Sequence, residues 1–414
     1  MSNSEKKEPQ IRFRKYTITW EQRKLLDCIE KITDFRGRTP KKLGMDWSES
    51  GYLALSALNV KDGYIDFMQD VHYGNQELYD KWMTGNELHK GQVLFTTEAP
   101  MGNVAQVPDN RRYILSQRTI AFSVKEDLIT ENFLATILRS PNVIVALTAL
   151  SSGGTAKGVS QKSLSAVEII IPSDLGEQEL LANTFLELDY LITLHQRKIK
   201  LLKKAKKMLL NKMFPKDGEN IPKLRFYDFT DAWKQERLGK LVNVYDGTHQ
   251  TPDYKTNGVM FLSVENIKTL KSEKYISKEA FERDFKIRPV KGDVLMTRIG
   301  NVGTAKVVAS NESVAYYVSL ALLKKKDLNP YFLEFSIHSS TVQNEIWKRT
   351  LHIAFPKKIN KNEIENILIN FPEDREQEII GLFFRSLDRL IALHQQKLKK
   401  LQDMKKSMLK KMFI

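Results

Sequence analysis

The 414-residue sequence contains a single cysteine, Cys28, which excludes an internal disulfide. A chain without disulfides fits a reducing compartment, so we expect it in the cytoplasm. Cys28 itself is expected to be a small buried hydrophobic residue. Long apolar runs are missing too, since nothing approaches the roughly 18–20 apolar residues that cross a membrane. The N-terminal region is charged, unlike a signal peptide.

The sequence also lacks the motifs of nucleotide-dependent enzymes. It has no Gly-x-x-x-x-Gly-Lys-Ser/Thr loop, no glycine-rich turn suited to S-adenosylmethionine or a dinucleotide, and no nuclease-like carboxylate cluster. Segment 329–332 (Asn-Pro-Tyr-Phe) partly matches the substrate loop of amino-methyltransferases but lacks their second proline. Its sister segment 130–133 favours a helix N-cap at both places. We therefore predict no catalytic residue, no metal site and no cofactor in this chain.

Acidic residues are outnumbered, because 65 Lys and Arg face 50 Asp and Glu, for a net charge of +15. This balance favours a polyanionic partner, and in the cytoplasm that partner would be nucleic acid. Much of the excess lies on two lysine-rich segments, where a solvated helix face explains it equally well.

The chain is organised around a segment that occurs twice. Residues 177–214 return as residues 376–413, with 20 of 38 positions identical in a gapless alignment. Both copies lack proline and are rich in good helix formers. Apolar residues recur at alternating steps of three and four, which predicts two coiled-coil helices. At ~1.5 Å per residue each helix would be about 55 Å long.

Polar residues interrupt both predicted seams at equivalent places. His195 and Lys206 break the first seam where His394 and Lys405 break the second. Such residues either fix the register of a coiled coil or lie at its edge with the lysine stems along apolar surface. The sequence leaves both interpretations open.

Further apolar residues widen the stripe beyond what one partner helix covers, which predicts a docking surface for another protein. The widening positions are Leu191, Leu194, Leu201, Leu390 and Leu393. The residues assigned to the seam and to partner docking are Leu188, Leu191, Ile192, Leu194, His195, Ile199, Leu202, Leu387, Leu390, Ile391, Leu393, His394, Leu398 and Leu401.

The repeat divides the chain into six segments in a cyclic order, with linker, domain and helix each occurring twice. The predicted segments are a polar, mobile arm (1–15), a first domain (16–175), a central helix (176–214), a linker (215–226), a second domain (227–375) and a C-terminal helix (376–414).

The two domains match each other more weakly than the helices do. The paired features are Trp20 with Trp233, Thr39-Pro40 with Thr251-Pro252, and Lys90–Thr96 with Lys291–Thr297. Short β-branched runs predict strands at 104–107, 120–124, 167–171 and 305–308. Residues 131–138 and 331–337 predict one helix per domain. Each domain is therefore expected to be mixed α/β, with a small curved sheet and long loops, in an α+β protein.

Base-reading side chains are expected to be polar or basic residues on loops. The candidates in the first domain are Arg36, Arg38, Lys41, Lys42, Thr97, Gln117, Arg118 and Lys157. Those in the second are His249, Gln250, Lys255, Arg298, Asn301, Tyr316, Arg349 and His352. Any one of them could be an ordinary solvated loop residue, and Tyr316, like Tyr317, is expected more often to be a core or packing residue than a base-stacking one. Matching positions differ in identity between the domains, which predicts two different recognised sequences.

The chain resembles the specificity subunit of type I restriction–modification enzymes. The resemblance is carried by the Trp-x-Gln segments, Lys291–Gly303 (KGDVLMTRIGNVG), the Ile-Pro…Glu-Gln segments at 171–178, with their counterpart at 371–377, and the LDxLIxLHQxK…KMF helices. It covers essentially the whole chain.

The resemblance implies two target-recognition domains that each read one half of a split DNA sequence. Two antiparallel helices would separate them in a pseudo-twofold arrangement, set the spacer and bind two methyltransferase subunits. Restriction subunits would then join. S-adenosylmethionine, ATP and Mg²⁺ would belong to partner subunits, and this chain would direct adenine methylation and restriction without catalysing either. A stand-alone DNA-binding regulator and a DNA methyltransferase are the alternatives.

Overall fold

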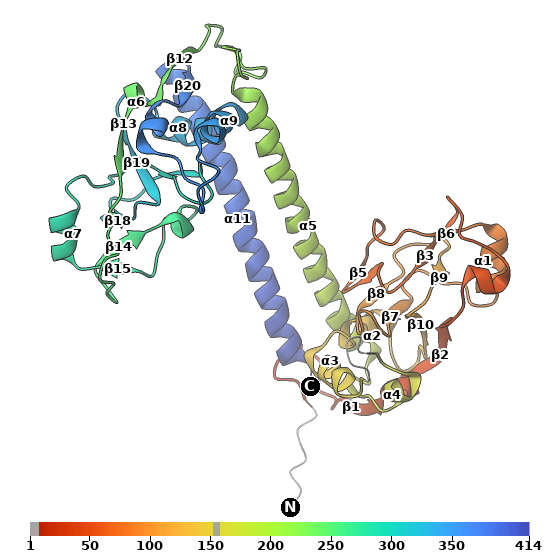
Figure 1. Cartoon of the computed structure of the whole chain (residues 1–414). Coiled ribbons are helices and arrows are strands. Elements are labelled where there is room, and N and C mark those ends of the chain that lie inside the picture. Colours follow the sequence, from red (N-terminus) through yellow and green to blue (C-terminus); the bar gives the residue numbers. More distant parts are fainter. Residues whose placement is uncertain (1–7, 152–157, 414) are drawn as a thin grey trace, which may run out of the picture. The chain divides into compact units, whose positions relative to one another are not determined.

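The computed structural model describes residues 8–151 and 158–413. The chain forms two compact units, one of Met1–Gln196 with Lys397–Ile414 and one of Arg197–Gln396. Each unit contains one small domain and a part of each of two long helices (Figure 1). Helix α5 runs over Leu175–Met213 and α11 over Asp374–Met412, which confirms both predicted helices.

The first domain combines short strands with short helices. Its strands are β1 (Glu21–Lys24), β2 (Ile29–Asp34), β3 (Tyr52–Leu55), β4 (Val60–Lys61), β5 (Tyr64–Ile65), β6 (Tyr73–Gly74), β7 (Val93–Thr96), β8 (Val104–Gln106), β9 (Ile114–Leu115), β10 (Thr119–Val124) and β11 (Glu168–Ile171). Its helices are η1 (Leu25–Cys28), η2 (Pro40–Leu43), α1 (Gln76–Met83), α2 (Glu131–Ile137), α3 (Pro141–Ala149) and α4 (Gln161–Ser165).

The second domain has a closely similar set of elements. Its strands are β12 (Lys234–Arg237), β13 (Val242–Asp246), β14 (Val259–Leu262), β15 (Tyr275–Ile276), β16 (Val294–Thr297), β17 (Ala305–Val307), β18 (Val314–Tyr316), β19 (Leu320–Lys325) and β20 (Leu368–Phe371). Its helices are α6 (Leu238–Leu241), η3 (Val264–Asn266), α7 (Lys278–Asp284), α8 (Pro330–Ile337), α9 (Ser340–Arg349) and α10 (Lys361–Glu365).

The sheets of the two domains have the same strand order. A four-stranded antiparallel sheet is ordered β2-β10-β7-β8 in the first domain and β13-β19-β16-β17 in the second. A three-stranded sheet (β6-β3-β9 or β15-β14-β18) and a two-stranded sheet (β1-β11 or β12-β20) also occur in each domain, and the first domain has an additional two-stranded sheet, β4-β5. The weak sequence match therefore reflects one frame used twice, and the expected mixed α/β domains with small sheets are confirmed.

The prediction of one helix per domain is wrong. Helices α2 and α8 lie where the pattern placed them, and Asn329 caps α8 by accepting from the backbone N–H groups of Tyr331 and Phe332. The additional helices are too short to show a clear helical repeat of apolar residues in the sequence, but side-chain N-caps mark the start of several of them. Ser140 and Ser339 cap α3 and α9, for example. Such N-caps satisfy backbone donors that the first helical turn leaves free.

The Glu-Gln pair at the start of each long helix fastens that helix to its domain. Glu177 accepts two hydrogen bonds from Arg12 (2.7 Å each), and Glu376 accepts two from Arg225 (2.8 and 2.7 Å). Both carboxylates are buried in the first helical turn, where the helix dipole favours negative charge. Arg12 belongs to the predicted mobile arm, so that prediction is wrong for its last residues; residues 1–7 of the arm lie outside the described structure.

The neighbouring glutamines connect the long helices to α2 and α8. The Gln178 side-chain oxygen accepts from the Thr130 N–H (3.0 Å), and the Gln377 oxygen accepts from the Asn329 N–H (2.9 Å). Each amide nitrogen donates to the carbonyl of the preceding proline, Pro172 or Pro372. The Ile-Pro…Glu-Gln segment at 171–178 and its counterpart at 371–377 thus attach each long helix to its domain.

The phenylalanine after each long helix completes a domain core. Phe413 packs with Trp20, Phe133 and Phe185, at ring-centroid distances of 6.4, 5.9 and 5.6 Å. In the other unit, Phe214 packs in the same way with the rings of Trp233, Phe332 and Phe384. Within each unit the end of one long helix therefore lies beside the start of the other, so the two run antiparallel there. Cys28, fully buried in the first core, behaves as predicted.

Both lysines that interrupt the seams form ion pairs across the helix pair. Lys405 lies 2.5 Å from Asp189, and Lys206 lies 2.5 Å from Asp388. The two pairs are equivalent in the repeat, and their side chains are largely covered. A shifted register would separate these charges, so the structure favours the interpretation that the lysines fix register.

One largely covered position differs in chemistry between the units. Arg139 follows α2 and forms ion pairs with Asp62 and Asp189. Its counterpart His338 follows α8 and accepts a hydrogen bond at Nε2 from the Ala305 N–H (3.1 Å). Burial, reinforced by Lys206 and Lys306, lowers the pKa of His338 to about 4, so this imidazole is neutral near pH 7.

No single helix within residues 8–151 and 158–413 is long and apolar enough to span a membrane, and only the bent pair α2–α3 passes by length and composition.

The Phe413→Ala substitution tests whether the first core depends on this ring. We expect it to lower the free energy of unfolding of that unit by about 3–5 kcal/mol, as for other buried phenylalanines. Hydrogen exchange should locate the loss of protection in residues 16–196. Tyr227→Ala, at a side chain that is 99% exposed, is the matched control and should change nothing. Unchanged exchange in the Phe413 variant would show that the core closes without it.

Candidate nucleic-acid interface

Four loops of each domain meet at one edge of its four-stranded sheet, which we call the recognition edge. In the first domain they follow β2 (35–39) and β7 (97–103), precede β10 (116–118), and lead into α4 (158–160). The corresponding loops of the second domain are 247–258, 298–304, 317–319 and 350–360. Their location follows from strand pairing, because β2 and β7 end where their common neighbour β10 begins.

Equivalent backbone hydrogen bonds join three of the loops in both domains. The Thr97 N–H donates to the Arg118 carbonyl, as the Arg298 N–H donates to Ser319 (2.9 Å each). Val159 donates to Thr97, as Ile359 donates to Arg298 (2.9 Å each). The backbone of the recognition edge is therefore shared, while its side chains differ.

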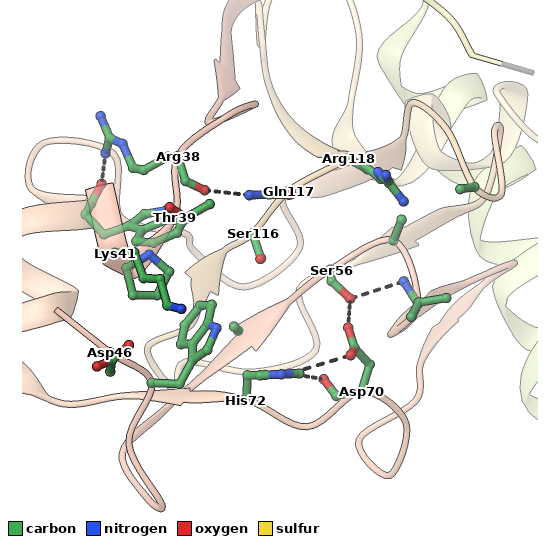
Figure 2. Close-up of a pocket in the computed structure, with 17 residues that line it drawn as sticks. Arg38, Thr39, Lys41, Asp46, Ser56, Asp70, His72, Ser116, Gln117 and Arg118 are labelled. Carbon is green, nitrogen blue, oxygen red and sulfur yellow. Dashed lines mark hydrogen bonds and ion pairs between the residues drawn. The ribbon is translucent and has the colours of Figure 1, made fainter. Parts of the chain in front are cut away.

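A cleft of about 610 Å³ opens at the recognition edge of the first domain (Figure 2). Four predicted base-reading residues line it, namely Arg38, Lys41, Gln117 and Arg118. Figure 2 shows Arg38, Thr39 and Lys41 grouped together, apart from Ser56, Asp70 and His72.

Several predicted readers in this domain already have protein partners. The Gln117 amide nitrogen donates to the Arg38 carbonyl (2.9 Å), and the Arg38 guanidinium donates to the Trp82 carbonyl (2.6 Å). Arg36 and Arg118 form exposed ion pairs with Asp34 and Glu98, and Lys42 donates to the Gly37 carbonyl. Exposed pairs are weak and exchange readily, so they leave Arg36 and Arg118 available to another anion. Lys157 lies outside the described residues.

The cleft also contains acidic and aromatic residues that the sequence did not identify. Asp70 accepts a hydrogen bond from Ser56 Oγ (2.6 Å) and lies 3.5 Å from His72 Nδ1. Trp47 packs at 5.5 Å from His72, measured between ring centroids. Carboxylates can accept from base amino groups, so Asp46 and Asp70 suit a reading surface as well as the cations do. Only the folding of distant loops brings these residues together, and we find no local pattern that marks them.

The structure corrects three of the sequence predictions. Thr97 is buried and its hydroxyl donates to the Arg118 carbonyl (3.3 Å). Arg298 is 8% exposed, forms an ion pair with Asp246 and donates Nε to the Ile359 carbonyl. Tyr316 is 1% exposed, its hydroxyl donates to the Asp246 carbonyl (3.1 Å), and burial raises its pKa. Because these side chains stabilise the domains from inside, we remove them from the set of base readers.

The remaining candidates of the second domain are accessible. His249 and Gln250 are exposed on the loop after β13, as is Asn301 on the loop after β16. Lys255 forms an exposed ion pair with Asp253. The other two candidates have structural partners: Arg349 pairs with Glu345 and Glu363, and a His352 ring nitrogen lies 2.8 Å from the Trp347 carbonyl, to which it can donate. The structure leaves His249, Gln250 and Asn301 as the least engaged of this set.

Within the described residues no group of three or more His, Cys, Asp or Glu could hold a metal ion. The two domains share one fold, and their loops carry hydrogen-bonding side chains of differing identity. This arrangement defines a recognition protein, and its net positive charge suits nucleic acid as the partner.

Comparison with known proteins agrees with this class. Residues 17–204 and 230–403 match the type I restriction modification DNA specificity domain, so the chain belongs to that family. It is a non-catalytic specificity subunit that recognises DNA sequence, which confirms the resemblance and sets aside the methyltransferase alternative.

Individual relatives cover nearly the whole chain. The type I restriction enzyme MjaVIII specificity subunit of Methanocaldococcus jannaschii is 21% identical over 405 residues, covering 94% of this chain and 91% of the relative. The crystal structure of a type I restriction–modification S subunit from M. genitalium has the same fold, with a TM-score of 0.67 at 14% identity, covering 98% of this chain and 99% of that one. A structure from work on the assembly of a type I system reaches a TM-score of 0.51 at 18% identity, covering 94% and 96%.

Arg298→Met and Asn301→Ala distinguish scaffold from reading surface. We expect Arg298→Met to lower the free energy of unfolding of the second unit by about 2–3 kcal/mol, because Asp246 loses its partner but is partly solvated. Asn301→Ala, at an exposed side chain, should change it by less than about 0.5 kcal/mol. Urea denaturation measures both. An Arg298→Met variant of normal stability that no longer binds DNA would return Arg298 to the reading surface.

Proposed function

We propose that this chain directs a type I restriction–modification complex to a bipartite DNA target, with each domain reading one half. The observation that carries the proposal is the repeated recognition edge: the same strand order and the same loop-to-loop hydrogen bonds support different exposed side chains. The first domain offers Lys41, Asp46 and Asp70 around a cleft, whereas the second offers His249, Gln250 and Asn301. Two frames with different readers are expected to select different half-sites.

We further propose that the long helices set the spacer between the half-sites. Helices α5 and α11 each contain 39 residues, which corresponds to about 58 Å at ~1.5 Å per residue. A rod of this length exceeds one turn of B-DNA, which is about 34–36 Å. The Lys206–Asp388 and Lys405–Asp189 pairs, by fixing the helix register, would fix that spacer as well.

The partners in this proposal are double-stranded DNA, two methyltransferase subunits and, in the full complex, restriction subunits, all in the cytoplasm. S-adenosylmethionine, ATP and Mg²⁺ would bind to those partner subunits. The exposed helix residues support a repeated docking site. Leu194 on α5 and its repeat equivalent Leu393 on α11 are each 45% exposed. Residues around them differ, since Tyr190 on α5 corresponds to Arg389 on α11. Two identical partners would use the shared position.

Exposure divides the residues predicted for the seam and for docking into groups, and we assign only the exposed ones to the proposed docking surface. Leu188, Ile199, Ile391 and His394 are buried, and Leu188 lies in the core of the first domain, so we leave all four out of the proposed docking surface. Leu194, Leu201, Leu390 and Leu393 are exposed and remain in the proposed docking surface. The other predicted positions are half-buried, namely Leu191, Ile192, His195, Leu202, Leu387, Leu398 and Leu401.

Exchange of residues 16–175 for the same segment of another specificity subunit tests the bipartite assignment. We expect one half-site to change and the other half-site and the spacer to persist, because each domain has its own sheets and core. Sequencing of methylated adenines in cells that carry the chain with its methyltransferase subunit gives the result. A change at both half-sites would contradict separate reading, and DNA binding without any directed methylation would favour a stand-alone regulator.

Leu194→Asp combined with Leu393→Asp tests the docking surface. We expect the double variant to lose co-purification with methyltransferase subunits while its unfolding temperature stays the same, since both side chains are solvated. Ile287→Asp, at a side chain of similar exposure (41%) outside the long helices, should co-purify normally. A normal complex from the double variant would place docking elsewhere.

A further inference from the structure

The loop between α9 and α10 exposes two large apolar side chains. Ile353 is 99% exposed and Phe355 is 104% exposed, so no other part of the described chain covers either one. We call residues 351–358 the apolar loop. Burying apolar side chains that are fully hydrated in the free protein lowers the free energy of a complex, so such side chains favour binding to a partner.

The base of the apolar loop is held firmly at the recognition edge. The Leu351 N–H donates to the Lys358 carbonyl (2.7 Å), and the Gly300 N–H donates to the Lys357 carbonyl (2.8 Å). At the N-terminal end of the loop, the ring of His352 also packs on the ring of Trp347, with centroids 4.7 Å apart. Ile353 and Phe355 are thus carried between two anchored ends, beside the loop that holds Asn301.

The charges around this loop favour a polyanion as its partner. Lys357 and Lys358 are exposed, and neither forms an ion pair with a carboxylate of the described residues. The nearest acids in sequence, Glu345 and Glu363, are both paired with Arg349. An apolar pocket of a protein partner would account for Ile353 and Phe355 but would leave the two lysines without anions.

We propose that Ile353 and Phe355 form a wedge that inserts between neighbouring base pairs of the half-site read by the second domain, while Lys357 and Lys358 contact the flanking phosphates. This inference rests on the proposed function, to which it adds a mode of DNA contact. Phe, Ile and similar side chains on DNA-binding proteins partly unstack a base step and kink the duplex. Flexible steps such as TA and CA are the easiest to open, so the wedge selects sequence through deformability.

The inference also predicts an asymmetry between the half-sites. The segment of the first domain that corresponds to the apolar loop, residues 151–158, reads Ser-Ser-Gly-Gly-Thr-Ala-Lys-Gly and has no apolar side chain larger than alanine. Only one half-site should therefore be unstacked.

The test uses the full chain in complex with its methyltransferase subunits. This complex is bound to DNA duplexes that carry the target sequence it methylates. 2-Aminopurine replaces one base at a time, outside the adenines to be methylated, so that base flipping by the methyltransferase does not contribute. We expect increased fluorescence at one step of one half-site with the natural chain. The double variant I353S/F355S should abolish this increase and weaken binding by about tenfold. The single variant F355L, which keeps an apolar tip, should retain most of both.

Val290→Ser is the matched control, because this 54%-exposed residue lies before β16, at the opposite end of the strand from the recognition edge. A duplex with a mismatch at the responding step should bind the natural chain more tightly and leave I353S/F355S unaffected, since the step is already open.

Full affinity and unchanged fluorescence in I353S/F355S would overturn the wedge while the bipartite function stands. Loss of co-purification with methyltransferase subunits in that variant would also overturn it, because the loop would then be a protein-docking surface. Absence of any directed methylation by the natural complex would instead refute the proposed function.

Discussion

The structure depends on a socket in each domain that a distant part of the chain must fill. Trp20, Phe133 and Phe185 surround Phe413, and the equivalent rings of the other unit surround Phe214. Without that ring, three aromatic side chains would line a void that the rest of the core cannot fill cheaply. The same junction holds the Arg–Glu pair with its buried carboxylate and the glutamine that accepts a hydrogen bond from the residue capping the domain helix. Domain, helix and linker are therefore interdependent within each unit.

This scaffold separates stability from recognition. The fastenings lie at the helix junction, whereas the recognition edge lies at the far ends of β7 and β16, joined mainly through backbone hydrogen bonds. Backbone hydrogen bonds do not depend on which side chain a residue carries. Loop residues can therefore be substituted while the backbone of the recognition edge is kept. The clearest exception is Arg298, where the frame itself uses a charged side chain. Its counterpart Thr97 fills the same buried place with a hydroxyl.

Sequence reasoning succeeded where the physics is periodic or local. Heptad spacing gave both long helices, β-branched runs gave strands such as β8 and β10, and an N-cap with proline explained Asn329. It failed where side-chain direction depends on distant pairing. Arg298 looked like a loop reader, yet its ion pair with Asp246, 52 residues away, holds its side chain inside the domain. Tyr316, for which packing was already the favoured interpretation, donates to the carbonyl of the same residue. The cleft with Asp46 and Asp70 arises only from packing among loops, and which of its residues contact DNA stays a prediction.

The division of the chain into units has a consequence for its synthesis. The second unit is a continuous stretch, Arg197–Gln396, and can fold as soon as it leaves the ribosome. The first unit is discontinuous, because its core needs Phe413. At about 5–20 residues per second, translation of the intervening 200 residues takes roughly 10–40 s. During that interval the socket around Trp20 is open and apolar, so the nascent N-terminal domain is a natural client for chaperones.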